Sequence, residues 1–166
     1  VSNIASENGT TATLYASWTP IVYDIKYHNT LPHSNPGTYT IESDAISLMN
    51  PEDKEGYTFT GWFEDEDFSG DPVIMIESGS HGDVDLYAGY VPNPYEIKFN
   101  ANGGEGKTAT LSMTYDVEKE LTENGFTRSG YTFLGWARTA DGSVVYSDKT
   151  PVINLESRTD KVVNLY

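Results

Sequence analysis

Hydrophobic and polar residues alternate with a period of two along several short segments of the chain. Residues 95–99 read YEIKF and residues 23–27 read YDIKY, so that in each segment aromatic and aliphatic side chains alternate with charged ones. This period is typical of a β-strand that buries one face. The sequence NGG at residues 102–104 can adopt positive φ angles and predicts a hairpin turn after the later strand. Short strands joined by turns are therefore the main predicted elements.

Each of the two regions that follow these strands contains a segment of another kind. One segment opens with Asp44 and closes on Pro51, and the other opens with Asp116 and closes on Gly125. An Asp suits the N-cap of a helix, and Pro or Gly ends one, so one or two helical turns or an irregular crossover would fit. No long helix is predicted. The expected fold class is therefore α+β, mostly β.

Several motifs occur more than once. Residues 56–62 read GYTFTGW and residues 130–136 read GYTFLGW. A closing motif reads LYASW at residues 14–18, LYAGY at 86–90, and LY at 165–166. The order of opening strand, GYTFxGW and closing strand runs twice, which indicates a tandem repeat.

The repeats predict three parts of the chain. Residues 1–19 are interpreted as the C-terminal tail of a preceding repeat, residues 20–91 as the first complete repeat module, and residues 92–166 as a second module truncated just before its final Ala-x-Trp. We expect each module to have its own core and the VPNP link at residues 91–94 to restrict the backbone between them. The tail resembles a closing strand without a sheet. We expect it to lie along the first module or to add to a sheet edge of a second copy.

The GYTFxGW motif concentrates aromatic residues. Phe59 and Trp62 would point to opposite faces of a regular strand, so Gly61 suggests a bulge that turns both rings inward, or a close approach of another backbone. An aromatic ligand platform is the functional alternative. We favour core packing, because modules this small need their large aromatic residues to form a core. The predicted core residues are Tyr57, Phe59, Trp62, Tyr131, Phe133 and Trp136.

The chain is strongly acidic. It has 25 acidic and 10 basic side chains and a net charge of −15, which disfavours nucleic acid and anionic lipid as partners. Fourteen acids and two bases lie in residues 20–91, against ten and eight in residues 92–166. A shared ligand site would keep its surface charges in both modules, whereas these modules share mainly their apolar motifs. No apolar run approaches the roughly 18 residues of a membrane helix, so we expect no membrane insertion.

Candidates for chemistry are few. The absence of cysteine excludes disulfides, a thiolate nucleophile and cysteine-based metal sites. No phosphate-binding glycine loop or nucleophile elbow occurs, and no pair of carboxylates is marked for catalysis. We therefore predict a non-enzyme with no catalytic residues and no cofactor. The three histidines share no metal-ligand spacing and are interpreted as surface residues: His28, His33 and His81.

One acidic loop resembles the first half of a calcium-binding loop. Residues 65–71 read DEDFSGD, with oxygen-bearing side chains at alternate positions and glycine at the sixth. The twelfth position holds Ile76 instead of the bidentate Glu that completes an EF-hand loop. We interpret the segment as a solvated hairpin loop and keep calcium as the alternative. The candidate ligands are Asp65, Asp67, Ser69 and Asp71.

A covalent crosslink is a further alternative. Lys98 in an opening strand and Asn164 in a closing strand would be neighbours if these strands pair, and Glu96 could assist amide formation. All three side chains are expected on the polar face, where a carboxylate is rarely desolvated. We therefore predict no crosslink.

Taken together, YxIxF, NGG, GYTFxGW and LYAxW resemble the Listeria–Bacteroides repeat, also called the internalin B-repeat. The resemblance covers nearly the whole chain, although the first module lacks NGG and has Tyr90 where Trp is usual. It implies tandem β-grasp, ubiquitin-like modules of a secreted or wall-anchored bacterial surface protein, without enzymatic activity. The implied location is extracellular, at the bacterial cell surface or cell wall.

The resemblance also implies a role. The repeats would act as a stalk or spacer and as an adhesion surface, with neighbouring repeats of the same chain as partners and a host protein or glycan as an outside partner. The alternative from another class is a specific binding module for a host protein or glycan. A large exposed apolar patch would favour that alternative.

Overall fold

The computed structural model describes residues 9, 11 and 13–166, and the described residues form strands, turns and loops without a helix. In the first module the strands are β1 (Val22–His28), β2 (Thr38–Thr40), β3 (Ile46–Ser47), β4 (Tyr57–Phe63), β5 (Met75–Ile76) and β6 (Val84–Pro92). In the second module they are β7 (Pro94–Phe99), β8 (Glu105–Gly106), β9 (Leu111–Thr114), β10 (Lys119–Glu120), β11 (Phe126–Thr127), β12 (Pro151–Val152) and β13 (Lys161–Leu165).

The first module has a four-stranded sheet in the order β2-β1-β6-β4. Its two central strands, β1 and β6, are parallel, and both outer pairs are antiparallel. The strands β3 and β5 form a small second sheet. Alternation of side chains along the strands places one face of the main sheet over a core of Ile25, Tyr39, Trp62, Ile76, Leu86 and Ala88.

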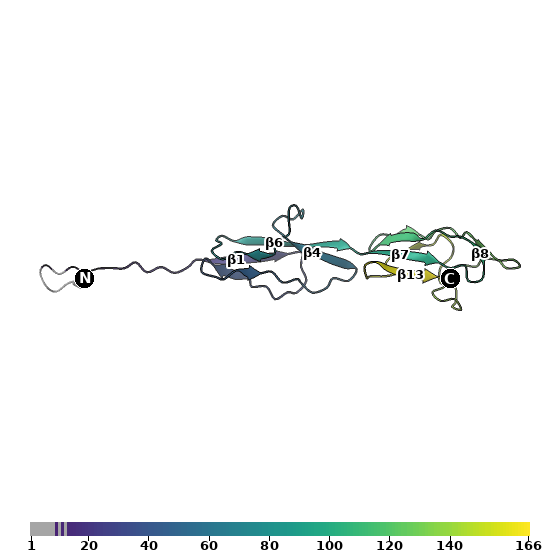
Figure 1. The fold of residues 1–166 in the computed structure, drawn as a ribbon, viewed down its shortest axis with the longest axis horizontal. Helices are drawn as coiled ribbons and strands as arrows, with labels where there is room; N and C mark the ends of the chain where they lie inside the picture. Colours follow the sequence, from purple (N-terminus) through teal and green to yellow (C-terminus); the bar gives the residue numbers. More distant parts are fainter. Residues whose placement is uncertain (1–8, 10, 12) are drawn as a thin grey trace.

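The second module repeats the central parallel pair. Here β13 and β7 are parallel and β9 pairs with the other edge of β7. Two small pairs, β10 with β12 and β8 with β11, complete it. A separate core contains Tyr95, Ile97, Phe99, Met113, Leu121, Trp136, Val152, Val163 and Leu165. The two modules follow each other end to end along an elongated molecule (Figure 1).

The part of the chain that the structure describes contains no helix, so the expected helical turns and the α+β assignment are wrong for this part. After Asp44 the chain enters β3, where Ile46 pairs with Ile76, and after Asp116 it enters β10, where Lys119 pairs with Val152. Cross-strand hydrogen bonds therefore replace the hydrogen bonds that a helix would supply. The alternative of an irregular crossover describes both segments.

The predicted bulge in GYTFTGW is confirmed. The register between β4 and β6 shifts between Phe59 and Gly61, and Gly61 has a φ of 139°. A side chain at Gly61 would meet Pro72 at 2.6 Å, so another part of the chain also passes close. In the second module, Gly135 has a similar φ of 144°, but residues 130–135 form no regular strand.

The described part of the tail does not lie along the first module. Residues 13–19 are extended and exposed and have no strand partner in the described chain. They project from the end of the first module where β1 begins (Figure 1). The expectation of a cis contact is therefore wrong for these residues, while residues 1–8, 10 and 12 lie outside the described part.

Candidate functional site

The junction between the modules is centred on Asn93, the single residue between β6 and β7. Its backbone N–H donates to Gly56 and its carbonyl oxygen accepts from the N–H of Tyr115, at 2.8 and 2.9 Å. Its side-chain oxygen accepts from Thr58, and its side-chain amide donates to the carbonyl oxygen of Ser157, at 2.6 and 2.7 Å. Asn93 is buried, and it thereby bonds to both modules with its backbone and its side chain.

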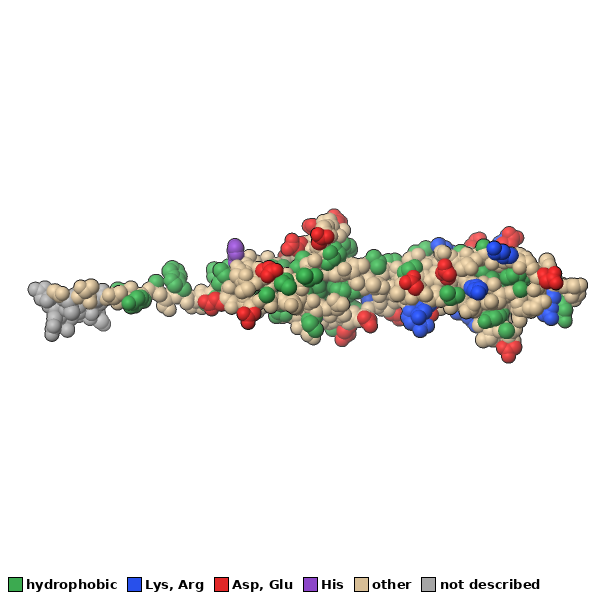
Figure 2. Space-filling model, viewed as in Figure 1, with side chains coloured by type: hydrophobic (Ala, Val, Ile, Leu, Met, Phe, Trp, Pro, Cys, Tyr) green, Lys and Arg blue, Asp and Glu red, His purple; other side chains and the backbone are tan. Residues whose placement is uncertain are grey.

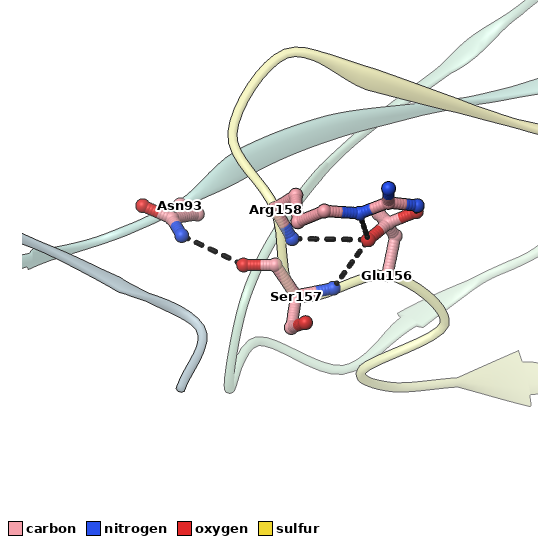
Figure 3. Close-up of polar contacts among 4 residues, drawn as sticks. All are labelled: Asn93, Glu156, Ser157 and Arg158. Atoms are coloured by element: carbon pink, nitrogen blue, oxygen red, sulfur yellow. Dashed lines mark hydrogen bonds and ion pairs between the residues drawn. The ribbon is translucent and has the colours of Figure 1, made fainter. Parts of the chain in front are cut away.

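The turn that receives Asn93 is held by one carboxylate (Figure 3). Glu156 accepts hydrogen bonds from the backbone N–H groups of Ser157 and Arg158, both at 3.0 Å. Its two oxygens also accept from the Arg158 guanidinium group at 2.9 Å. The Arg158 contacts and these backbone bonds lower the pKa of Glu156 to about 2. The ionised Glu156 thus fixes the direction of the Ser157 carbonyl group.

A second polar contact crosses the junction beside Asn93. The Tyr57 hydroxyl group donates to one oxygen of Asp116 at 2.7 Å, and the side-chain amide of Asn154 donates to the other at 2.7 Å. Asn154 also accepts from the Asp116 N–H at 2.6 Å. The hydrogen bond from Asn154, followed by that from Tyr57, lowers the pKa of Asp116, and Asp116 in turn raises the pKa of Tyr57.

Aromatic packing closes the same face of the junction. The rings of Tyr57 and Tyr115 meet edge to face, with centroids 5.8 Å apart. A side chain at Gly56 would collide with the Tyr115 ring, so this position requires glycine, which also has a φ of 77° there. The Lys54 ammonium group lies over the Tyr57 ring at 4.4 Å. The junction is therefore a packed and hydrogen-bonded interface.

The six aromatic residues assigned to the core lie in different environments. Trp62 and Trp136 are buried in the two cores, and Phe59 packs against the first core. Tyr57 lies at the junction and is partly buried. Tyr131 and Phe133 do not lie in the core: they are 68% and 39% exposed. Their exposure follows because no strand of the described chain pairs with residues 130–135.

The acidic loop has no geometry of a metal site. Ser69 donates to Asp65 at 2.8 Å, and all four candidate calcium ligands are exposed. Within the described residues, no group of three or more His, Asp or Glu side chains is close enough to hold a metal ion.

The three histidines lie in different environments and do not contact one another. His28 contacts Asp85 at 2.7 Å and stacks on Tyr87, while His81 is exposed. His33 is partly buried against Tyr27 and Trp62, with ring centroids 4.3 and 5.5 Å apart, so its assignment to the surface is wrong. The first module uses His33 as a packing residue.

The crosslink candidates are in register but exposed. Lys98 and Asn164 are direct partners in the parallel pair of β7 and β13, and Glu96 lies two residues away on the same strand. All three side chains are exposed to solvent. The desolvation that would let a lysine act as a nucleophile is therefore missing.

A groove lined by both aromatic and polar residues lies along the GYTFLGW segment of the second module. We call it the groove; it has a volume of about 450 Å³. Its lining includes Phe126, Tyr131, Phe133, Leu134, Trp136 and Tyr166.

The sequence patterns missed the junction residues. Asn93 and Ser157 are 64 positions apart, and Tyr57 and Asp116 are 59 apart, so no local pattern links them. One local signal was available. Asn93 stands between Pro92 and Pro94, which have no N–H groups, so that Asn93 is the sole backbone donor in that stretch.

Comparison with known proteins places these modules in a family. No solved structure matches the chain. It is 31% identical over 144 residues to a protein of Evansella cellulosilytica named provisionally as a membrane protein, covering 78% of this chain and 20% of that protein. A second protein of that organism, named provisionally as a Gly-rich membrane protein, is 35% identical over 161 residues, covering 90% and 16%.

Internalin H of Listeria monocytogenes is 32% identical over 99 residues, covering 58% of this chain and 17% of that protein. The chain thus spans a fifth or less of the length of these relatives. In the described residues no helix is long and apolar enough to cross a membrane. The model of the Listeria-Bacteroides repeat domain matches residues 23–89 and again residues 95–159, and the chain belongs to this family.

Proposed function

We propose that the two modules form a rigid section of a stalk in a bacterial cell-surface protein. The observation that carries this proposal is Asn93, whose backbone and side chain bond to both modules at once. A flexible linker would leave these groups to water, and the modules would then reorient freely. The hydrogen bonds of Asn93 instead favour one orientation of the two modules relative to each other. A spacer needs such a fixed orientation to keep its two ends at a constant distance.

The proposal concerns a non-enzymatic role at an extracellular location, on the cell surface or in the cell wall. It is supported by membership of the repeat family and by the similarity to internalin H. The central parallel pair, β1 with β6 and β7 with β13, also supports assigning each module to a helix-free variant of the β-grasp fold.

Distances between spin labels test the rigidity. The chain has no cysteine, so Lys26→Cys and Lys98→Cys give one label in each module, on equivalent exposed strand positions. We expect a narrow distance distribution. Asn93→Ala should broaden it, whereas Asn50→Ala, at an exposed position without a hydrogen bond in the described chain, should leave it unchanged. A broad distribution of label distances in the protein with Asn93 intact would contradict a rigid stalk.

Specific binding of a host protein or glycan is the second candidate. The groove favours it, because Tyr131 and Leu134 leave apolar surface exposed there. Binding of the protein to glycan arrays and to panels of host surface proteins would test this candidate. The Tyr131→Ser variant should lose any binding that uses the groove.

A further inference from the structure

Each main sheet has an edge strand with a free outer side, β2 in the first module and β9 in the second. Both are internal segments of the chain, and each pairs on its inner side with the strand that opens its module. The outer side of an edge strand presents N–H and C=O groups to which a strand of another molecule can bind. We therefore asked what occupies these groups.

In β9, Ser112 and Thr114 direct their backbone groups away from the sheet. In an antiparallel pair of strands, hydrogen bonds form at every second residue pair. The N–H of Tyr115 donates to the C=O of Asn93, so Tyr115 and every second residue before it are bonded to the neighbouring strand. The N–H and C=O groups of Ser112 and Thr114, which lie between the bonded residues, consequently point outward.

Both outward C=O groups of β9 are already occupied. The Lys119 ammonium group donates to the carbonyl oxygen of Ser112 at 2.7 Å, and the N–H of Val117 donates to that of Thr114 at 3.2 Å. Lys119 belongs to β10, where pairing with β12 holds its backbone. A strand that approached this edge would find no free acceptor at these two residues and would have to displace a charged side chain.

The first module protects the equivalent position in another way. The strand registers make Thr40 of β2 the equivalent of Thr114. Thr40 donates its N–H to the Ser43 hydroxyl group and accepts from the Ser43 N–H with its carbonyl oxygen, both at 3.0 Å. Three residues after Thr114 the second module has Val117, which has no hydroxyl group. Lys119 therefore supplies a protection that the second module lacks at this place.

The charge of the two modules makes this difference matter. Residues 20–91 have fourteen acids and two bases, whereas residues 92–166 have ten and eight. Figure 2 shows acidic side chains on the first module, and the Lys and Arg side chains visible in it gather on the second. A large net charge keeps copies of a protein apart. The second module has little net charge, so its edge depends on local protection.

We propose that Lys119 closes the edge of β9 to the same edge of a second copy, and so keeps neighbouring copies from pairing side by side. Two β9 strands that paired antiparallel about a twofold axis would join two sheets into one. The two Lys119 ammonium groups would then meet at the seam, where like charges repel each other. This inference concerns contacts between copies and does not depend on the rigidity of the junction at Asn93.

Replacing the lysine tests the proposal. Lys119→Met keeps an unbranched side chain and removes the ammonium group. In sedimentation equilibrium the unsubstituted protein should keep the 18.3 kDa mass of one chain, and Lys119→Met should shift towards a dimer, with association at least about tenfold tighter. Lys119→Arg keeps a charged donor and should stay monomeric. Lys107→Met is the matched control, because Lys107 is exposed and forms no side-chain hydrogen bond in the described chain.

A second substitution shows whether the dimer uses the edge of β9. The N–H of Ser112 points outward, so Ser112→Pro removes a donor from the edge without removing a hydrogen bond between β7 and β9. Adding Ser112→Pro to Lys119→Met should return the protein to a monomer. Ser112→Ala keeps the N–H group and, in the same background, should leave the dimer intact.

Three results would overturn the proposal. A folded Lys119→Met that stays monomeric at every concentration would show that the edge is closed without the lysine. Equal association of Lys107→Met would assign the effect to the added apolar side chain. A dimer that persists after Ser112→Pro is added would place the contact on another surface. Dispersed NMR spectra of each variant would establish that it is folded.

Discussion

The hydroxyl group of Tyr57, in the first module, donates a 2.7 Å hydrogen bond to the carboxylate of Asp116, in the second. These residues are 59 positions apart, and their contact stands beside the bonds of Asn93. Together with the edge-to-face contact of Tyr57 and Tyr115, it gives the junction an aromatic side as well as a polar one. The geometry of one module is thereby coupled to the geometry of the next.

The Tyr57→Phe substitution should raise the pKa of Asp116, because a hydrogen bond to its ionised form is lost. Asn154→Ala should raise that pKa further, since Asn154 is the larger cause of the shift. NMR titration of the Asp116 carboxyl group would measure both effects. Tyr131→Phe is the matched control at the equivalent position. An unchanged pKa in both junction variants would show that these bonds do not persist in solution.

Acid should weaken the turn that carries Ser157. The folded-state pKa of Glu156 is about 2, below its ordinary value of 4.5, so its contribution to stability is full above pH 4.5 and is lost as the pH falls through 2. Urea unfolding of the protein and of Glu156→Gln should therefore differ at pH 6 and converge at pH 2. A difference in the free energy of unfolding between the protein and Glu156→Gln that stays constant from pH 6 to pH 2 would contradict the low pKa of Glu156.

Replacing Trp136 with alanine should cost about 3 to 5 kcal/mol of the free energy of unfolding, enough to unfold a marginal module. The first module has its own core and should remain folded. Two-dimensional NMR spectra would show loss of dispersed signals from the second module alone. The exposed Trp18→Ala is the control, with no expected loss of stability. Unfolding of both modules together would indicate one cooperative unit.

Gly135→Ala should destabilise the second module by at least about 1 kcal/mol. The φ of Gly135 is 144°, and an added side chain would meet the carbonyl oxygen of Tyr146 at 2.5 Å. Gly37→Ala is the control, because Gly37 lacks a positive φ and has open space around it. Thermal unfolding of the two variants would compare them, and equal melting temperatures would contradict the requirement for glycine at position 135.

Local patterns predicted much of the fold. The period of two located the opening strands, and Gly61 marked the bulge, because both depend on residues close in sequence. The segments after Asp44 and Asp116 had helix signals, but pairing with β5 and β12 decided their structure. Those partners lie about 30 residues away in sequence, beyond the reach of a capping pattern.

The junction was harder to predict for the same physical reason. The two prolines around Asn93 indicated a restricted link, but the bonding partners of Asn93 come from three distant segments of the chain. Likewise, GYTFLGW has the residues of a strand, yet it lacks the paired partner that would make it one in the described chain. A strand depends on its neighbour as well as on its own side chains.

The parallel pairing of β1 with β6 has a mechanical consequence. Each module enters through one strand of this pair and leaves through the other, so the two points at which the chain would be pulled lie at opposite ends of adjacent strands. Tension along the molecule would shear the strands past each other and strain their backbone hydrogen bonds together instead of opening them one after another. The rate of forced unfolding should accordingly be low, and the two modules should withstand pulling from the ends of the chain.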